Sequence, residues 1–317
     1  MKYKEVILEL NRIDEKDRTY RITTETHIEK LAASIEDIGL LNAPILEKRN
    51  DHFIILSGFR RVAACNILNT GKIKTRIVSS KTPRLNRAKI AISENSFQRA
   101  LNLIETSRAL NLLVEFIEDK AGLQASASIL ALPKHIKVID NIMQLSLLPD
   151  SIQQAVISET IGLPVALHLG KMEETIAEAF LNFFQKLRFG LNKQRECILL
   201  SEEISHREDI SLLGILKDPL IDAIMNDGNK DRAQQGRELR RYLKQRRYPQ
   251  LSHAESVFED EKKALKLENQ IRFYPPLHFE GVTYTFQFQF STLNEYRERL
   301  QTLNRLADHA SFKKIIS

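Results

Sequence analysis

The sequence predicts an α+β protein that is mostly helical, with an α/β domain at the N-terminus, a helical bundle in the middle and a β-hairpin plus helix module at the C-terminus. Short β-rich runs alternate with helix-like segments up to about residue 92. From Ser93 onward apolar residues keep a spacing of three and four, and residues 282–290 alternate strictly between apolar and polar side chains. Glycine (11 of 317 residues) and proline (9) are scarce, which also favours helix.

The N-terminal segment predicts a helix, a two-stranded hairpin, a second helix and a third strand, in that order. A helix covers residues 26–39, where Thr26 and Glu29 match a capping box and Gly39 suits a helix C-terminus. The β-rich runs APILEK and HFIILS, with Arg-Asn-Asp between them, predict a hairpin. A helix from Gly58 to Gly71 and a strand with the sequence KTRIV follow.

The rest of the chain predicts short helices up to about residue 187, further helix over 193–247, and then a strand over 282–290 with a closing helix after it. Residues 271–279 are the candidate hairpin partner of that strand, although their two prolines limit pairing. We therefore expect four domains: 1–100, 101–187, 188–247 and 248–317. The last of these is expected to dimerise by strand or helix pairing, or else to cap the helices before it.

Charge and cysteine content restrict the classes of function. The formal net charge is +6, and residues 230–247 alone hold eight basic and two acidic side chains. A helix there could neutralise phosphates, or it could simply be solvated. Two cysteines, Cys65 and Cys197, form no zinc spacing. Residues 1–17 are too charged for a signal peptide, and no uncharged run is long enough to cross a bilayer, so we expect a cytoplasmic protein without membrane contact.

A first chemical pattern lies where the predicted strand ending at Ser57 runs through Gly58 into a helix that carries Arg60 and Arg61. Free backbone N–H groups and the dipole at a helix start favour an anion. Adjacent arginines lie about 100° apart around a helix, so they can reach different phosphate oxygens. A Walker loop is excluded because G-x-x-x-x-G-K-[ST] is absent. The alternative is a helix start with two surface arginines.

A second pattern is SENSFQR at residues 93–99. If Ser93 caps a helix, Glu94 and Asn95 present a carboxylate and an amide oxygen side by side at its start. Such ligands suit a Mg²⁺ ion that also contacts substrate phosphates. Gln98 and Arg99 then follow one turn later. The alternative is a polar helix start with an internal ion pair.

Together these segments resemble the ParB-like partition protein family. LAASIEDIGLLNAPIL at 31–46 is similar to its first motif, and residues 58–64 match its G-E-R-R-x-x-A motif. Glu94-Asn95 and, one residue later than usual, Gln98-Arg99 match its E-N-x-Q-R motif. The motifs occur in the family's order, and the resemblance extends over residues 1 to about 175.

The resemblance implies an N-terminal domain that binds CTP and Mg²⁺, with Glu94 and Asn95 at the metal. The residues it assigns to the nucleotide are Ser57, Gly58, Phe59, Arg60, Arg61, Glu94, Asn95 and Arg99. It further implies a homodimer that closes as a clamp around double-stranded DNA in chromosome or plasmid partition, or in gene regulation. A ParA-type ATPase is then a candidate partner, and the expected location is the nucleoid.

Residues 122–149 are similar, without a gap, to the family's helix-turn-helix, with a recognition helix that would begin near Lys134. In such motifs the first turn of the second helix meets base edges and phosphates. The residues expected to contact DNA are Lys134, His135, Lys137 and, in the basic segment, Arg240, Arg241 and Lys244. An ordinary helical bundle with solvated basic residues is the alternative.

Phe59 departs from the family, which has glutamate there. A phenyl ring cannot accept a proton or orient water, so we predict slow or absent CTP hydrolysis. The alternative is that Phe59 packs against the core while another group positions the water.

Two other classes of function stay open at this stage. One is a small-molecule phosphotransfer enzyme on the same fold, with Glu94 as its base, and the other is a transcriptional regulator that uses no nucleotide. The related sulfiredoxin fold needs a cysteine in the loop corresponding to Ser57–Arg61, which has none, and Cys65 is expected to be buried in the helix that follows.

Overall fold

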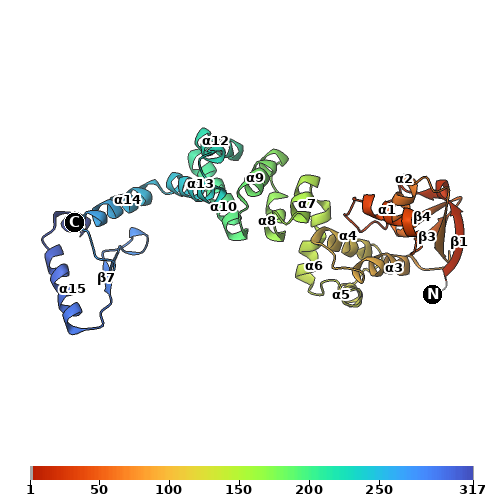
Figure 1. The fold of residues 1–317 in the computed structure, drawn as a ribbon, viewed down its shortest axis with the longest axis horizontal. Coiled ribbons are helices and arrows are strands. Elements are labelled where there is room, and N and C mark those ends of the chain that lie inside the picture. The colour runs from red at the N-terminus through yellow and green to blue at the C-terminus, as the bar shows by residue number, and fades with distance from the viewer. Residues whose placement is uncertain (1–2, 317) are drawn as a thin grey trace. The chain divides into compact units, whose positions relative to one another are not determined.

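The structure is a computed structural model that describes residues 3–316. It divides into two compact units, Met1–Gln185 and Lys186–Ser317, which follow one another along the chain in Figure 1. The other two domain boundaries proposed from the sequence, after residues 100 and 247, lie inside these units. Within residues 3–316, every helix is too short or too polar to cross a membrane.

The first unit begins with a five-stranded sheet in the order β1-β5-β3-β4-β2. β3 (Ile45–Arg49) and β4 (His52–Ser57) form the predicted antiparallel hairpin, and β5 (Lys72–Val78) runs parallel to β3. β1 (Tyr3–Glu9) and β2 (Ile13–Asp14) are edge strands that the sequence patterns did not indicate. A 3-10 turn, Leu10–Arg12, separates them.

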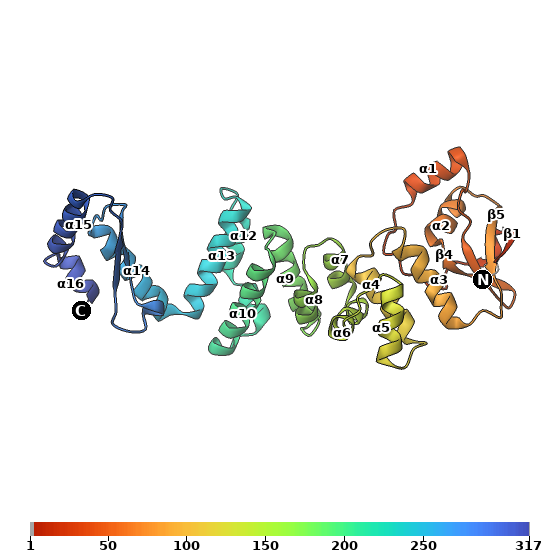
Figure 2. The same ribbon diagram turned by 90° about the horizontal axis from the view of Figure 1, so that it is seen from below.

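Alternate residues of β4 point to opposite faces of the sheet. Ile54 and Leu56 pack with α3 (Arg84–Ser96) and the helices after it. Phe53 and Ile55 pack with α1 (Glu29–Ile38) and α2 (Phe59–Ile67) on the other face. Figure 2 shows α1 and α2 on the opposite side of the sheet region from α3. β4 is therefore buried on both faces, and its last residue leads directly into α2.

The first two helices depart from the prediction at their ends. α1 begins at Glu29 rather than near Thr26, and no side chain caps it, because Arg60 binds Glu25 and the carbonyl of His27 and holds that stretch outside the helix. Gly39, at φ +80°, ends α1 as predicted. α2 ends at Ile67, four residues before the predicted Gly71, because Thr70 turns back and bonds the carbonyl of Cys65.

Helices continue the first unit after the sheet. They are α4 (Leu103–Val114), α5 (Lys120–Ile129), α6 (Ile136–Met143), α7 (Asp150–Ile157), α8 (Leu163–Leu169) and α9 (Glu174–Leu187), with a 3-10 turn at Leu145–Leu147. Residues of α4, α5 and α6 share one apolar cluster with α3 and the sheet. α6 begins two residues after Lys134, with His135 as its N-cap, so Lys134 lies in the connection and not in the first turn.

The second unit contains helices and one small sheet. Its elements are α10 (Leu191–Glu208), α11 (Leu212–Leu216), α12 (Pro219–Asn226), α13 (Arg232–Arg247), α14 (Pro249–Ala264), β6 (Ile271–Tyr274), a 3-10 turn (Leu277–Phe279), β7 (Thr285–Phe288), α15 (Leu293–Leu306) and α16 (Ala310–Ile316). α13 is the predicted basic helix, and it packs along α10. β6 and β7 pair antiparallel as expected.

The C-terminal strand is shorter than its sequence pattern. β7 ends at Phe288, and Val282, which the pattern included, is 92% exposed. β6 offers a partner of only four residues, because Pro275-Pro276 follow it and proline has no N–H to donate to a ladder. α16 follows α15, so the predicted closing helix is not the last element.

Candidate functional site

A cavity of about 280 Å³ opens at the carboxyl end of β4 in the first unit. Its walls come from the start of α2, the end of α3, the segment before α1 and the segment after it. All eight residues that the resemblance assigns to a nucleotide line this cavity, namely Ser57, Gly58, Phe59, Arg60, Arg61, Glu94, Asn95 and Arg99. The structure thus brings together two motifs that lie more than thirty residues apart in the sequence.

The start of α2 presents an anion-favouring wall. Gly58 is its N-cap at φ +101°, and no side chain caps the helix. A Cβ on Gly58 would lie 2.8 Å from Pro44 Cβ and 3.1 Å from Arg61 Nε, so both conformation and space require glycine. The first N–H groups of a helix have no intrahelical acceptor, and the helix dipole adds partial positive charge. This wall therefore suits a phosphate group.

The opposite wall is the end of a helix, where the sequence analysis expected a start. α3 runs from Arg84 to Ser96, so Glu94 and Asn95 lie in its last turn and Ser93 does not cap it. The apolar residues of α3 before Ser93 are buried against the sheet, and this packing extends the helix upstream of the polar motif. Carbonyl groups at a helix C-terminus favour a cation. The cavity therefore lies between an anion-favouring and a cation-favouring helix end.

Arg60 and Arg61 hold the two segments that flank α1. Arg60 forms an ion pair with Glu25, and its Nη2 donates to the carbonyl of His27 at 2.7 Å. Arg61 donates from Nη1 to the carbonyls of Asn42 and Ala43 at 3.0 and 3.3 Å. Burial lowers the pKa of Arg61, and the nearby carboxylate of Glu94 opposes that shift.

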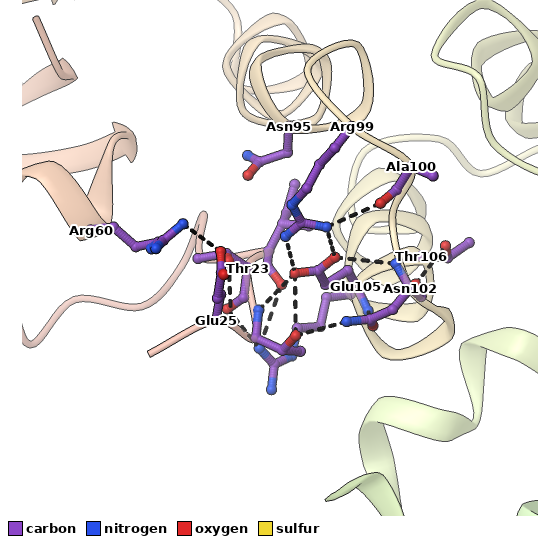
Figure 3. A network of polar contacts seen from close by, with 12 residues as sticks. Thr23, Glu25, Arg60, Asn95, Arg99, Ala100, Asn102, Glu105 and Thr106 are labelled. Atoms are coloured by element: carbon purple, nitrogen blue, oxygen red, sulfur yellow. Dashed lines mark hydrogen bonds and ion pairs between the residues drawn. The ribbon is translucent and has the colours of Figure 1, made fainter. Parts of the chain in front are cut away.

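Arg99 is oriented by a carboxylate that the site prediction did not include. Its guanidinium donates to both oxygens of Glu105, at 2.7 and 2.6 Å, and the side chain of Glu105 is 0% exposed. Thr24 donates its backbone N–H to the same carboxylate at 2.9 Å, and Asn102 does so at 3.2 Å (Figure 3). Asn102 and Glu105 form a capping box at the start of α4, and this N-x-x-E pattern could have revealed Glu105 in the sequence.

Glu25 is a second carboxylate at the cavity that the site prediction did not include. It directly precedes the helix predicted over residues 26–39 and belongs to no motif, and Figure 3 shows its carboxylate facing Arg60. Three arginines at the cavity, Arg60, Arg61 and Arg99, are thus accompanied by three carboxylates, Glu25, Glu94 and Glu105.

Glu94 and Asn95 offer oxygen ligands of the kind that Mg²⁺ takes. Asn95 donates its Nδ2 to the carbonyl of Ala91 at 2.7 Å, which leaves its Oδ1 for other partners. Among residues 3–316, no cluster of three or more His, Cys, Asp or Glu side chains has the geometry of a metal site. Mg²⁺ in proteins is commonly held by one or two carboxylates together with substrate phosphates. The residues at the end of α3 fit a magnesium ion of that kind, one that a polyphosphate brings with it.

Phe59 has two environments. It packs against the apolar cluster under α1 and α2, and it lines the cavity. It also lines a smaller adjoining cavity of about 120 Å³, together with Glu25, Arg60 and Arg21. Cys65 is 1% exposed inside α2, as expected, and burial raises the pKa of its thiol.

The residues expected to contact DNA differ in their surroundings. Lys134, His135 and Lys137 are all exposed, around the start of α6. In the second unit, Arg240 and Lys244 both form ion pairs with Glu196 of α10, at 2.6 and 3.1 Å.

Two further basic residues of α13 are also paired, Arg246 with Glu208 and Arg247 with Glu203. Arg241 is exposed and lines an open hollow beside Arg237. It has no ion pair within the described part of the chain. Much of the charge on α13 is therefore balanced by acidic residues of α10 and its neighbours.

The comparison with protein families identifies the domain that builds the cavity. Residues 2–96 match the model of the ParB N-terminal domain. Over this segment the chain is similar to a ParB N-terminal domain. Seven of the eight assigned residues lie within residues 2–96, and Arg99 lies three residues beyond the match.

Two curated proteins are similar in sequence to part of this chain. The probable chromosome-partitioning protein ParB of Helicobacter pylori is 27% identical over 141 residues, which are 44% of this chain and 47% of that protein. The corresponding protein of Treponema pallidum is 28% identical over 143 residues, or 45% and 42% of the two chains. The match thus spans less than half the length of each relative, and the chain is ParB-like through this N-terminal part.

Among solved structures, the chain is similar to C-terminally truncated ParB from Caulobacter crescentus complexed with CTP-gamma-S. The identity is 20%, over 55% of this chain and 97% of that chain, with a TM-score of 0.26.

Proposed function

We propose that this chain is a DNA-binding partition or regulatory protein whose N-terminal domain binds CTP with Mg²⁺ and uses the nucleotide to control a DNA clamp. In this proposal the chain is a cytoplasmic, nucleoid-associated homodimer on double-stranded DNA, with a ParA-type ATPase as a further partner. One observation supports it above the others. The eight assigned residues line a single cavity between the start of α2 and the end of α3.

The roles of the cavity residues follow from its electrostatics. A triphosphate with its magnesium carries negative charge at one end and a bound cation beside it. The α2 wall, with Arg60 and Arg61, suits the phosphate oxygens, because guanidinium groups donate two hydrogen bonds in a plane. The α3 wall, with Glu94 and Asn95, suits the ion. Arg99, oriented by Glu105, supports the phosphates from the side.

The DNA-binding part of the proposal rests on α5, α6 and the basic helix. Lys134, His135 and Lys137 are exposed on one short stretch, as a helix-turn-helix requires of residues that meet a groove. In the second unit, Arg241 is the best placed of the three proposed contacts, because Arg240 and Lys244 are paired with Glu196. Dimerisation through residues 248–317 completes the proposed clamp.

Calorimetric titration of the full chain with CTP, ATP, ADP and GTP, each with Mg²⁺ and with and without DNA, tests the nucleotide part. We expect selective binding of CTP. Arg60→Ala and Arg61→Ala should each weaken it at least tenfold, since each removes a charged donor to a phosphate. Arg12→Ala is the control, because Arg12 lies outside the cavity.

Other outcomes distinguish the competing classes of function. Preference for ATP or ADP would support a phosphotransfer enzyme on this fold instead. The absence of nucleotide binding, with DNA binding retained, would leave a regulator that uses no nucleotide. Both results would contradict the proposed CTP-controlled clamp.

A further inference from the structure

We infer that Glu25 competes with the nucleotide phosphates for Arg60, so that it lowers the affinity of the site and must be displaced for full binding. This inference rests on the proposed nucleotide function. It assigns to Glu25 a role that no sequence motif indicates, because the residue meets Arg60 across 35 positions of the chain.

The carboxylate of Glu25 already binds the guanidinium group of Arg60 that a nucleotide phosphate would use. Its Nη1 is taken by the carboxylate of Glu25 and its Nη2 by the carbonyl of His27. Its Nε is buried and has no hydrogen-bond partner among residues 3–316. A carboxylate and a phosphate present similar oxygen geometry to this planar fork. Held side by side on one guanidinium group, the carboxylate of Glu25 and a phosphate would repel one another, so each weakens the binding of the other.

Two ion pairs lie at this cavity, Arg60–Glu25 and Arg99–Glu105, and the first is the easier one to break. The side chain of Glu25 is 46% exposed and that of Arg60 is 35% exposed, and pairs this accessible to water contribute little to stability. Glu105, by contrast, is fully buried and binds Arg99, Thr24 and Asn102 together. Separating Glu105 from its partners would leave an unpaired charge buried in the protein, whereas the side chain of Glu25 can rotate out into the solvent.

The neighbouring contacts limit what moves when Glu25 is displaced. Thr23 is held by Arg108, whose Nη1 donates to its carbonyl at 3.2 Å, and Thr24 is held by Glu105. Of the next three residues, Glu25 accepts from Arg60 through its side chain and His27 through its carbonyl, and the segment then leads into α1. Phosphate binding at Arg60 therefore frees the approach to α1 while the chain stays anchored at Thr24.

Calorimetric titration with two probes, inorganic triphosphate and CTP, each with Mg²⁺, tests the competition on the full chain. Glu25→Gln keeps the size of the side chain and removes its charge. We expect it to bind both probes about tenfold more tightly than the natural chain, within the usual range of coupling between two ligands of one site. The control is Glu29→Gln, an exposed carboxylate four residues away that has no ion pair in the described residues.

A double variant separates competition at Arg60 from a general effect of charge. In the Arg60→Ala background, Glu25→Gln should give no further gain, because the shared guanidinium is gone. Hydrogen exchange of residues 25–28 should become faster when triphosphate is added to the natural chain, and should already be fast in Glu25→Gln.

The results that overturn the inference are distinct from those that overturn the proposed function. Equal affinity of Glu25→Gln and the natural chain, with Arg60→Ala weaker than both, would refute the role of Glu25 and leave the nucleotide site intact. A gain that persists without Arg60, or that Glu29→Gln reproduces, would also refute it. No binding of either probe to the natural chain or to Glu25→Gln would overturn both proposals.

Discussion

Arg99 and Glu105 form a two-point ion pair that joins the end of α3 to the start of α4. The two hydrogen bonds, of 2.7 and 2.6 Å, run to a carboxylate that is fully buried although Arg99 itself is 44% exposed. The same carboxylate accepts the backbone N–H of Thr24, so it ties the segment before α1 to both helices. The buried side chain of Glu105 thus positions Arg99 and fixes the segment before α1 relative to the end of α3.

We expect Glu105→Gln to lower the free energy of unfolding by about 2 kcal/mol, since hydrogen bonds to a charged group are lost and Arg99 keeps its charge without a partner. Urea titration measures this change. Glu115→Gln, an exposed carboxylate at the end of the same helix, is the matched control and should change stability by less than about 0.5 kcal/mol. Equal effects of the two substitutions would contradict the structural role of Glu105.

The pair also predicts a pH dependence of stability. Burial by itself raises the pKa of Glu105, but the bonds from Arg99, Thr24 and Asn102 outweigh it and hold the pKa below its usual value. The unfolded chain therefore binds the proton more readily, with a pKa of about 4.3. The stabilisation is complete above that pH and is lost as the pH falls through it towards the folded-state pKa. Urea midpoints of the natural chain and Glu105→Gln should converge below about pH 4, and a constant difference would count against this account.

Gly58 is expected to tolerate no side chain. Gly58→Ala should lower stability by about 1–3 kcal/mol, because an L-residue is strained at φ +101° and its Cβ meets Pro44. The variant should also lose nucleotide binding, since Arg61 is displaced. Gly71→Ala is the control, as a Cβ there meets nothing within 4 Å. Thermal unfolding of both variants checks the prediction, and a Gly58→Ala chain as stable as Gly71→Ala would refute it.

Because position 59 holds phenylalanine instead of glutamate, we predict that bound CTP is hydrolysed slowly or not at all. A phenyl ring cannot act as a base, whereas Phe59→Glu would place a carboxylate at the start of α2 beside Arg60. We expect Phe59→Glu to release phosphate from CTP at least tenfold faster than the natural chain in the presence of DNA. Phe59→Gln has a similar size without a base and should stay slow. Rapid hydrolysis by the natural chain would mean that another group positions the water.

The ion pairs of α13 predict unequal effects on DNA binding. Arg241→Ala should weaken binding and reduce by about one the slope of log affinity against log salt concentration, because an unpaired cation is lost. Arg240→Ala should mainly affect stability, since Arg240 is bound by Glu196. Fluorescence anisotropy at several salt concentrations measures both. The same slope change for the two variants would show that the pair with Glu196 opens on DNA.

The local secondary-structure elements and the motif residues follow from the sequence. Local patterns predict the β3–β4 hairpin from its β-rich runs, the end of α1 from Gly39 and the C-terminal strand pair from alternating apolar residues, because neighbours in these elements are also neighbours along the chain. The family motifs likewise nominate the eight residues that line the cavity.

Tertiary packing alone decided the rest. It extends α3 backward so that Glu94 and Asn95 end a helix, and it brings Glu25 to Arg60 and Glu196 to Arg240 across 35 and 44 positions. No local pattern contains these pairings, because a charged side chain selects its partner only after the sheet and helices have packed. The sequence by itself therefore indicated eight of the residues that line the cavity. The fold determined that Glu25 and Glu105 join them and which of the charges are already engaged, because those contacts form only when distant segments pack together.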